Sequence, residues 1–196
     1  MREMTICTWV KWRTDTPWQR IFDFGNGTGH YMFLTPNNGS EMRFVMKNKG
    51  DEEILSAPKL SISRWVHVTL SIGEEAVVLY VDGEEVGRST EMTIRPSDIK
   101  PVMNYIGRSQ FKNDPLIKAY LDDFRIYNYA LNQTEVKGII EEANAIESVT
   151  DGAAEAISTE YYSVDGSRLT SPQRGVNIVR TRYANGKVSV KKVLNQ

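Results

Sequence analysis

The feature of the sequence that most constrains the fold is a succession of short runs rich in β-branched and aromatic residues, each ended by a turn cluster. These runs predict strands over residues 5–12, 19–24, 30–35, 41–47, 65–72 and 76–81. The clearest turns are the glycine-rich stretch 25–29 and the pair Asp82-Gly83, which favours a two-residue hairpin because both positions need a positive φ. Many short strands with regular turns predict an all-β sandwich or barrel and not a βαβ fold.

One helix is predicted near residues 133–143. Asn132 is a suitable N-cap, and Glu135 three residues later completes a capping box. The apolar stripe that follows has helical spacing and consists of Val136, Ile139, Ile140 and Ala143. We expect this helix to pack on the edge of the sandwich and close the domain.

The chain divides into two parts by composition. Residues 146–156 are small and polar without periodicity, which predicts a linker between a domain at 1–145 and a tail at 157–196. The tail carries seven bases against two acids, so it has a charge of +5, while the whole chain has a charge of −1. Because these bases alternate with apolar residues, they are typical of a solvated strand face, and no nucleic-acid partner is predicted.

The length and the residue types exclude several classes of protein and of functional site. A chain of 196 residues buries one good core and a small second unit. No apolar run approaches the roughly 20 residues that a membrane span needs. The single cysteine, Cys7, excludes an internal disulfide and is expected to be buried. His30 and His67 lack the partners of a metal site or triad, and His67 is expected to face outward or make a structural hydrogen bond.

Four segments occur in a fixed order: Trp65-Val-His-Val68, Leu79-Tyr-Val-Asp-Gly83, Ile106-Gly-Arg-Ser109 and the stretch 121–131 beginning Leu-Asp-Asp-Phe-Arg-Ile-Tyr. Together with residues 4–11 they resemble the laminin-G-like jelly roll of the concanavalin A-like lectin and glucanase superfamily. The resemblance implies a two-sheet antiparallel jelly roll. We expect Trp9, Trp65, Val66 and Val68 in its core. The family's first strand, before the position of Met4, is missing here, which would leave a gap beside the last strand.

The tail resembles the C-terminal sorting or anchoring tails of secreted Gram-negative proteins through three segments, 162–169, 175–180 and 191–194. This resemblance implies a protein that is secreted, periplasmic or held at the cell surface. Together the two resemblances imply a parent catalytic domain, a glycoside hydrolase, upstream of Met1.

Catalysis by this chain is not expected. A glycoside hydrolase needs two carboxylates at a defined separation, and the Glu-x-Asp-x-(x)-Glu run of the superfamily's glucanases is absent. Asp122 and Asp123 are adjacent, so on a strand they point to opposite faces. The resemblance implies that Asp122 joins backbone carbonyls around a calcium ion. The alternative is that Asp122 accepts backbone hydrogen bonds and orders a loop.

Sugar recognition requires exposed aromatic faces and planar polar groups on neighbouring loops. The residues that meet this description are Trp18, His30, Tyr31, Asn37, Asn38, Arg108, Gln110 and Phe111. Trp18 could instead pack over the end of the sandwich, and Arg108 could form an ion pair with Asp122 or Asp123. The leading hypothesis is a non-catalytic module that binds poly- or oligosaccharide. The alternatives are a structural or protein-interaction spacer and a catalytic lectin-fold enzyme.

Overall fold

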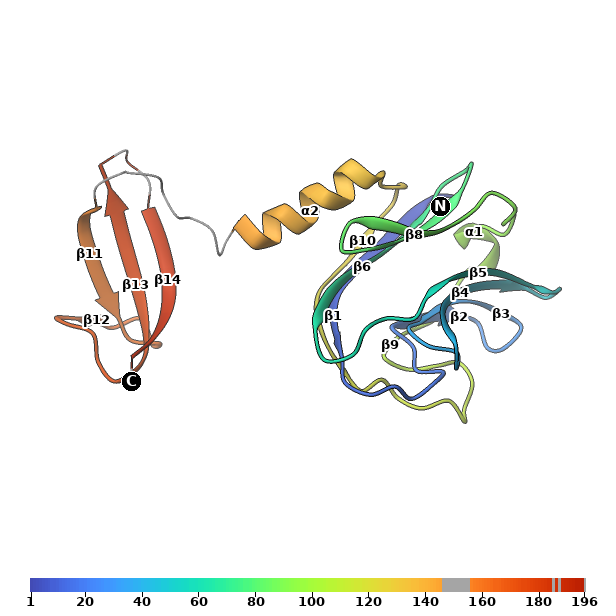
Figure 1. Cartoon of the computed structure of the whole chain (residues 1–196), viewed down its shortest axis with the longest axis horizontal. Coiled ribbons are helices and arrows are strands. Elements are labelled where there is room, and N and C mark those ends of the chain that lie inside the picture. Colours follow the sequence, from blue (N-terminus) through green and yellow to red (C-terminus); the bar gives the residue numbers. More distant parts are fainter. Residues whose placement is uncertain (146–155, 185, 187, 196) are drawn as a thin grey trace. The chain divides into compact units, whose positions relative to one another are not determined.

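The computed structural model describes residues 1–145, 156–184, 186 and 188–195 (Figure 1). The chain separates into two compact units, Met1–Glu142 and Ala143–Gln196, and each is described by itself. The predicted linker at 146–156 lies outside the described residues except for its last residue.

The first unit is a sandwich of two five-stranded antiparallel sheets. The first sheet has the order β10 (Ala119–Tyr127), β1 (Met4–Trp12), β6 (Trp65–Ile72), β7 (Val77–Val81) and β8 (Glu84–Ser89). The second has the order β5 (Glu52–Pro58), β4 (Glu41–Asn48), β3 (His30–Thr35), β2 (Phe22–Gly25) and β9 (Met103–Ile106). A short helix, α1 (Pro96–Ile99), which the sequence pattern did not predict, lies between β8 and β9 in the chain. The predicted antiparallel jelly roll is confirmed.

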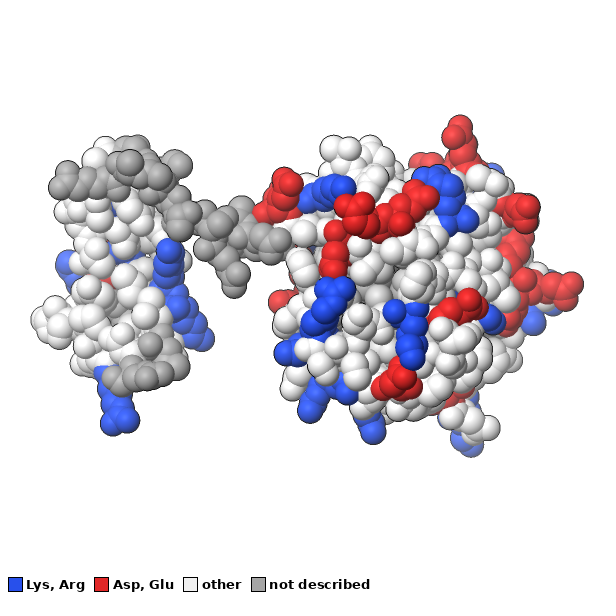
Figure 2. Space-filling view, in the orientation of Figure 1, with Lys and Arg blue, Asp and Glu red and all other residues white. Residues whose placement is uncertain are grey.

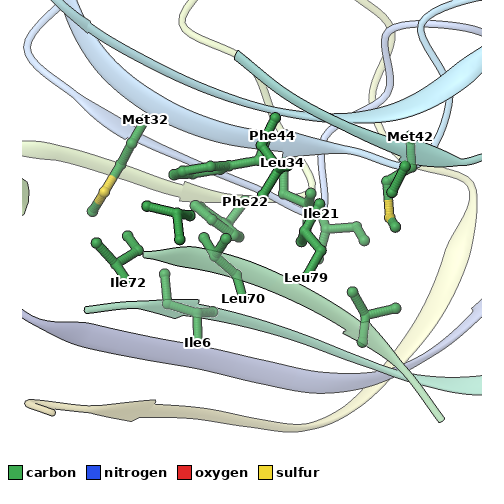
Figure 3. Packing of buried hydrophobic residues seen from close by; sticks show 14 of the residues in the cluster. Ile6, Ile21, Phe22, Met32, Leu34, Met42, Phe44, Leu70, Ile72 and Leu79 are labelled. Carbon is green, nitrogen blue, oxygen red and sulfur yellow. The ribbon is translucent and has the colours of Figure 1, made fainter. Parts of the chain in front are cut away.

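The core lies between the two sheets, where alternate residues of each strand meet (Figure 3). Phe22, Leu34 and Phe44 of the second sheet face Leu70 and Leu79 of the first. Each is at most 2% exposed, because strand side chains alternate between the core and the outer face. The core is therefore built from the apolar positions that define the sequence pattern.

The tryptophan of the core is Trp12, which is fully buried, and the prediction that Trp65 fills the core is wrong. Trp65 is 42% exposed. Since Val66 points into the core, the preceding side chain must point outward, and its ring lies 6.4 Å from that of Tyr120. Trp9 also differs from the prediction. It is half-buried, and its ring packs edge-on against His67.

The Asp82-Gly83 turn joins β7 to β8 as predicted. Asp82 has φ 52° and Gly83 has φ 79°, and the flanking residues Val81 and Glu84 are paired. The carboxylate of Asp82 also accepts a hydrogen bond from the backbone N–H of His67, at 2.8 Å. The turn thus fixes the register of β7 and β8 and ties the hairpin to β6.

Helix α2 (Gln133–Ala145) begins with the predicted capping box. The side chain of Asn132 accepts a hydrogen bond from the N–H of Glu135 at 3.1 Å, and Glu135 accepts one from the N–H of Asn132 at 2.8 Å. Val136 and Ile139 pack with Val78 and Tyr80 of β7, so the helix covers the outer face of the first sheet and not the sandwich edge. The side chain of Ala143, the last residue of the predicted stripe, lies outside the described part.

Replacing Asn132 with alanine is expected to lower the free energy of unfolding by about 1 kcal/mol, because the N–H of Glu135 loses its acceptor. Urea unfolding at neutral pH measures this change. Thr134→Ala is the matched control, since Thr134 is an exposed first-turn residue whose loss should cost less than about 0.5 kcal/mol. Equal stabilities of the two variants would contradict a capping role.

The second unit is a four-stranded antiparallel sheet with the order β12 (Arg168–Leu169), β11 (Ala156–Tyr162), β13 (Gly175–Tyr183) and β14 (Val188–Asn195). Several of its apolar side chains are exposed, including Ile157 and Val190 at more than 60%. Figure 2 shows mostly basic atoms among the charged atoms on its visible face, consistent with the charge of the tail. A sorting or anchoring role for this unit stays a prediction.

Among the described residues, no helix has the length and apolar character needed to cross a membrane.

Candidate functional site

The outer face of the second sheet carries the candidate site. Tyr31 and Phe33 of β3 and Val45 of β4 point away from the core and form a small cluster of their own with Phe111. Phe111 comes from the segment 107–118 between β9 and β10, which folds over this face, and its ring packs edge-on against Tyr31 at 5.5 Å. Two segments distant in sequence are thus brought together on one sheet face.

A central cavity of about 220 Å³ opens on this face. Its apolar lining consists of Trp18, Phe33, Val45 and Phe111, and its polar lining consists of Arg20, Arg43, Glu52 and Asp114. Trp18 is 38% exposed and has φ 63°, a left-handed conformation that is strained for a bulky residue. Its backbone N–H donates to the carbonyl of Asn37 at 2.8 Å, which helps to hold it there.

Arg20 lies beneath the cavity and connects its walls. The residue is only 1% exposed, and the central carbon of its guanidinium lies 3.8 Å from the centre of the Phe33 ring. Nη2 is 2.7 Å from the carboxylate of Asp114, and Nη1 donates to the carbonyl of Trp18 at 2.8 Å. Arg20 therefore fixes both the Trp18 loop and the 107–118 segment to the sheet.

Asp23 is a second buried charge in this network. Its Oδ2 lies 3.6 Å from Nε of Arg20 and accepts hydrogen bonds from the N–H of Gln110 at 2.9 Å and the hydroxyl of Ser109 at 3.3 Å. Burial raises the pKa of Asp23 to about 6, against the lowering effects of these hydrogen bonds and of Arg20. Asp23 and Arg20 were not among the predicted site residues. No motif marks them, because Asp114, the partner of Arg20, is 94 residues away, and Gln110, which donates to Asp23, is 87 residues away.

Tyr31 does not offer its ring to a sugar; it supports the site through its hydroxyl group. The residue is 1% exposed, and its hydroxyl donates to the carboxylate of Glu52. Burial, together with that carboxylate, raises the pKa of Tyr31. Because Phe111 packs against its ring, Phe111 and Trp18 are the aromatic groups left at the rim of the central cavity.

The predicted asparagines and Gln110 make internal hydrogen bonds. The amide of Asn37 bonds to Asp15, and that of Asn38 accepts the N–H groups of Ser40 and Glu41 in a tight turn. The amide nitrogen of Gln110 donates to the carbonyl of Met103 at 2.8 Å. These side chains hold the loops around the sheet face.

His30 and Arg108 lie apart from the central cavity. His30 alternates with Tyr31 along β3, so its side chain points to the opposite face. The guanidinium of Arg108 lies 4.8 Å from the centre of the Tyr105 ring. The ion pair considered for it with Asp122 or Asp123 is not formed among the described residues: Asp123 pairs with Arg125 at 2.7 Å, and the side chain of Asp122 accepts the N–H of Asp123.

Asp122 lies on β10 beside a bulge at which Asp123 has φ 51°. Its Oδ1 accepts the N–H of Asp123 at 2.9 Å, and its carbonyl accepts the hydroxyl of Thr8 at 2.8 Å. Among the described residues, no three His, Cys, Asp or Glu side chains gather as a metal site. The hydrogen bond that Asp122 accepts from the backbone of Asp123 is what the loop-ordering alternative predicts. Calcium binding at Asp122 stays a prediction.

Comparison with known families gives a match over residues 1–137, to the model described as the concanavalin A-like lectin/glucanases superfamily. The chain belongs to this superfamily. The match covers the sandwich and the first part of α2. No curated protein matches the chain significantly.

Three solved structures illustrate the shared fold of this superfamily member. Domain 4 of AbnA, a GH43 extracellular arabinanase from Geobacillus stearothermophilus in complex with arabinotriose, is 21% identical, with 70% of this chain and 66% of that chain covered and a TM-score of 0.59. The CBM40 of the Ruminococcus gnavus IT-sialidase, bound to α2,3-sialyllactose, is 19% identical. The match covers 71% of this chain and 83% of that chain, with a TM-score of 0.62. A Trypanosoma rangeli sialidase is 17% identical. The match covers 72% of this chain and 23% of that chain, with a TM-score of 0.55. These likenesses show the fold alone.

Proposed function

We propose that the first unit is a non-catalytic carbohydrate-binding module whose ligand enters the central cavity. The observation that carries this proposal is the meeting of Trp18 and Phe111, from two separate loops, at the rim of a cavity with polar groups inside it. Aromatic faces pack against the C–H faces of sugars, and the guanidinium of Arg43 and the carboxylate of Glu52 offer partners for hydroxyl groups. The arabinotriose and sialyllactose complexes of proteins with this fold support the proposal.

The chemistry of the cavity favours binding over hydrolysis. Hydrolysis requires one carboxyl group that delivers a proton and another that acts as base or nucleophile. Asp114 is bonded to Arg20 and to the hydroxyl of Ser109, and Glu52 accepts the hydroxyl of Tyr31. Asp23, whose pKa is raised, is fully buried and does not reach the ligand space.

The wider setting is part of the same proposal. We infer a secreted or surface-attached protein of a Gram-negative bacterium, in which this module holds a glycoside hydrolase on its polysaccharide and the second unit serves sorting or anchoring. The extracellular arabinanase among the structures of this fold supports an extracellular setting.

Trp18→Ala is expected to weaken glycan binding about tenfold, because a sugar ring loses its stacking surface. Trp65→Ala is the matched control, since Trp65 is similarly exposed but lies on the other sheet. A glycan array identifies the ligand, and calorimetry with that ligand, with and without calcium, measures both variants. Equal losses in the two variants would place the ligand elsewhere. No binding to any glycan, with a thermal stability that sugars leave unchanged, would favour the spacer alternative.

A further inference from the structure

A second cavity, of about 460 Å³, adjoins the central one. We call it the edge cavity, since it lies at β9, the edge strand of the second sheet. Tyr105 of β9 is paired with Asp23 and therefore points to the same outer face. Phe111 and Asp114 line both cavities, so a ligand crossing Phe111 would occupy them in succession.

The edge cavity has uncompensated positive charge. Arg108 and Lys112 line it, and neither side chain takes part in the ion pairs found among the described residues. Asp114 is the acid in its lining, and that carboxylate is paired at 2.7 Å with the buried Arg20, which also lies 3.6 Å from the carboxylate of Asp23. A negatively charged group would therefore find two cations available in this cavity.

The guanidinium of Arg108 is also oriented. Its central carbon lies over the ring of Tyr105, and this contact restricts where its N–H donors can point. Met103 and Leu116 add apolar surface to the same cavity. Apolar surface next to an oriented guanidinium suits a sugar ring that carries an anionic group, because the ring contacts the former and the anion pairs with the latter.

We propose that the edge cavity is a second subsite that takes an acidic sugar residue, with its carboxylate or sulfate held by Arg108 and Lys112. This inference rests on the proposed function, in which the neighbouring sugar of the same chain occupies the central cavity. The oligosaccharide then crosses the strands from β4 to β9.

The test uses the full chain and pairs of glycans that differ in one charge. Each uronic acid oligosaccharide is compared with its carboxyl-reduced counterpart, and each sulfated oligosaccharide with its desulfated one. We expect the acidic member of at least one pair to bind about tenfold more tightly at low salt, and this preference to shrink at high salt. The double variant Arg108→Ala/Lys112→Ala should lose the preference while it keeps the affinity for the neutral member.

The matched control is Arg64→Ala/Lys137→Ala, which removes the same charge from two exposed ion pairs, Arg64 with Asp82 and Lys137 with Glu84. It should keep the acidic preference. The acidic subsite is overturned if acidic and neutral members bind equally, or if both double variants lose the preference alike. In either case, binding of neutral glycans would still uphold the proposed function. If no glycan binds at all, both proposals fail.

Discussion

Replacing Arg20 with methionine is expected to lower the free energy of unfolding by about 3–5 kcal/mol. The substitution leaves the carboxylates of Asp23 and Asp114 without their cation, and Asp23 is fully buried. An uncompensated charge in a dry site costs far more than the loss of the ion pair alone. Chemical unfolding at pH 7 gives the change.

Two further variants separate this cause from a general loss of packing. Arg43→Met removes a guanidinium from the same cavity, but its pair with Glu41 is about 30% exposed on both sides, so the expected cost is at most about 1 kcal/mol. Adding Asp23→Asn and Asp114→Asn to Arg20→Met should recover much of the lost stability, because the unpaired charges are gone. A loss of equal size in the Arg20 and Arg43 variants would contradict the argument.

The second large effect is a pH dependence in which two buried groups act in opposite directions. His67 is 1% exposed, with Nδ1 3.2 Å from the hydroxyl of Thr69, and burial lowers its pKa from 6.5 to about 4. Between pH 6.5 and 4 the unfolded chain binds the extra proton, so His67 removes about 3 kcal/mol of stability as the pH falls.

Asp23 has the opposite sign. Its pKa rises from 3.8 to about 6 on folding, so the folded state binds the extra proton between pH 6 and 4. This group therefore adds about 3 kcal/mol of stability as the pH falls through the same interval. In the wild-type protein the two contributions nearly cancel.

Single variants should reveal both contributions. Relative to the wild type, His67→Gln should gain about 3 kcal/mol as the pH is lowered from 7 to 4, and Asp23→Asn should lose about as much. Urea unfolding at each pH unit measures the slopes. The double variant is the control, and it should restore the wild-type slope, because the two groups lie on outer faces of different sheets and their effects should add. Parallel slopes for all four proteins would refute the assignment.

The sequence pattern predicts the strands whose apolar residues alternate or run together, and it misses those that contribute little to the core. Residues 30–35 and 65–72 are predicted to the residue, because both contain long runs of apolar and β-branched positions. β5 was missed because only Leu55 and Ala57 of its seven residues are buried. The capping box of α2 is local, so Asn132 and Glu135 are enough to predict it.

The candidate site was only partly predictable, because its geometry depends on contacts between distant segments. Trp18 and Phe111 were predicted from residue type and lie at the central cavity. For Asn37, residue type did not reveal that its amide is bonded to Asp15. Arg20 and Asp23 resemble ordinary surface charges in the sequence, and only the folded segment 107–118 shows that they are buried.

The position of β1 inside the first sheet has a consequence for synthesis of the chain. β1 is made well before β10, which is one of its two neighbours in the sheet, and the Thr8 hydroxyl bonds to a carbonyl 114 residues later. At about 5–20 residues per second, translation needs on the order of ten seconds to make that partner. During this interval one edge of the nascent β1 has no native partner. The first sheet can therefore be completed only after β10 has been made, and such pairing between segments distant in sequence slows folding.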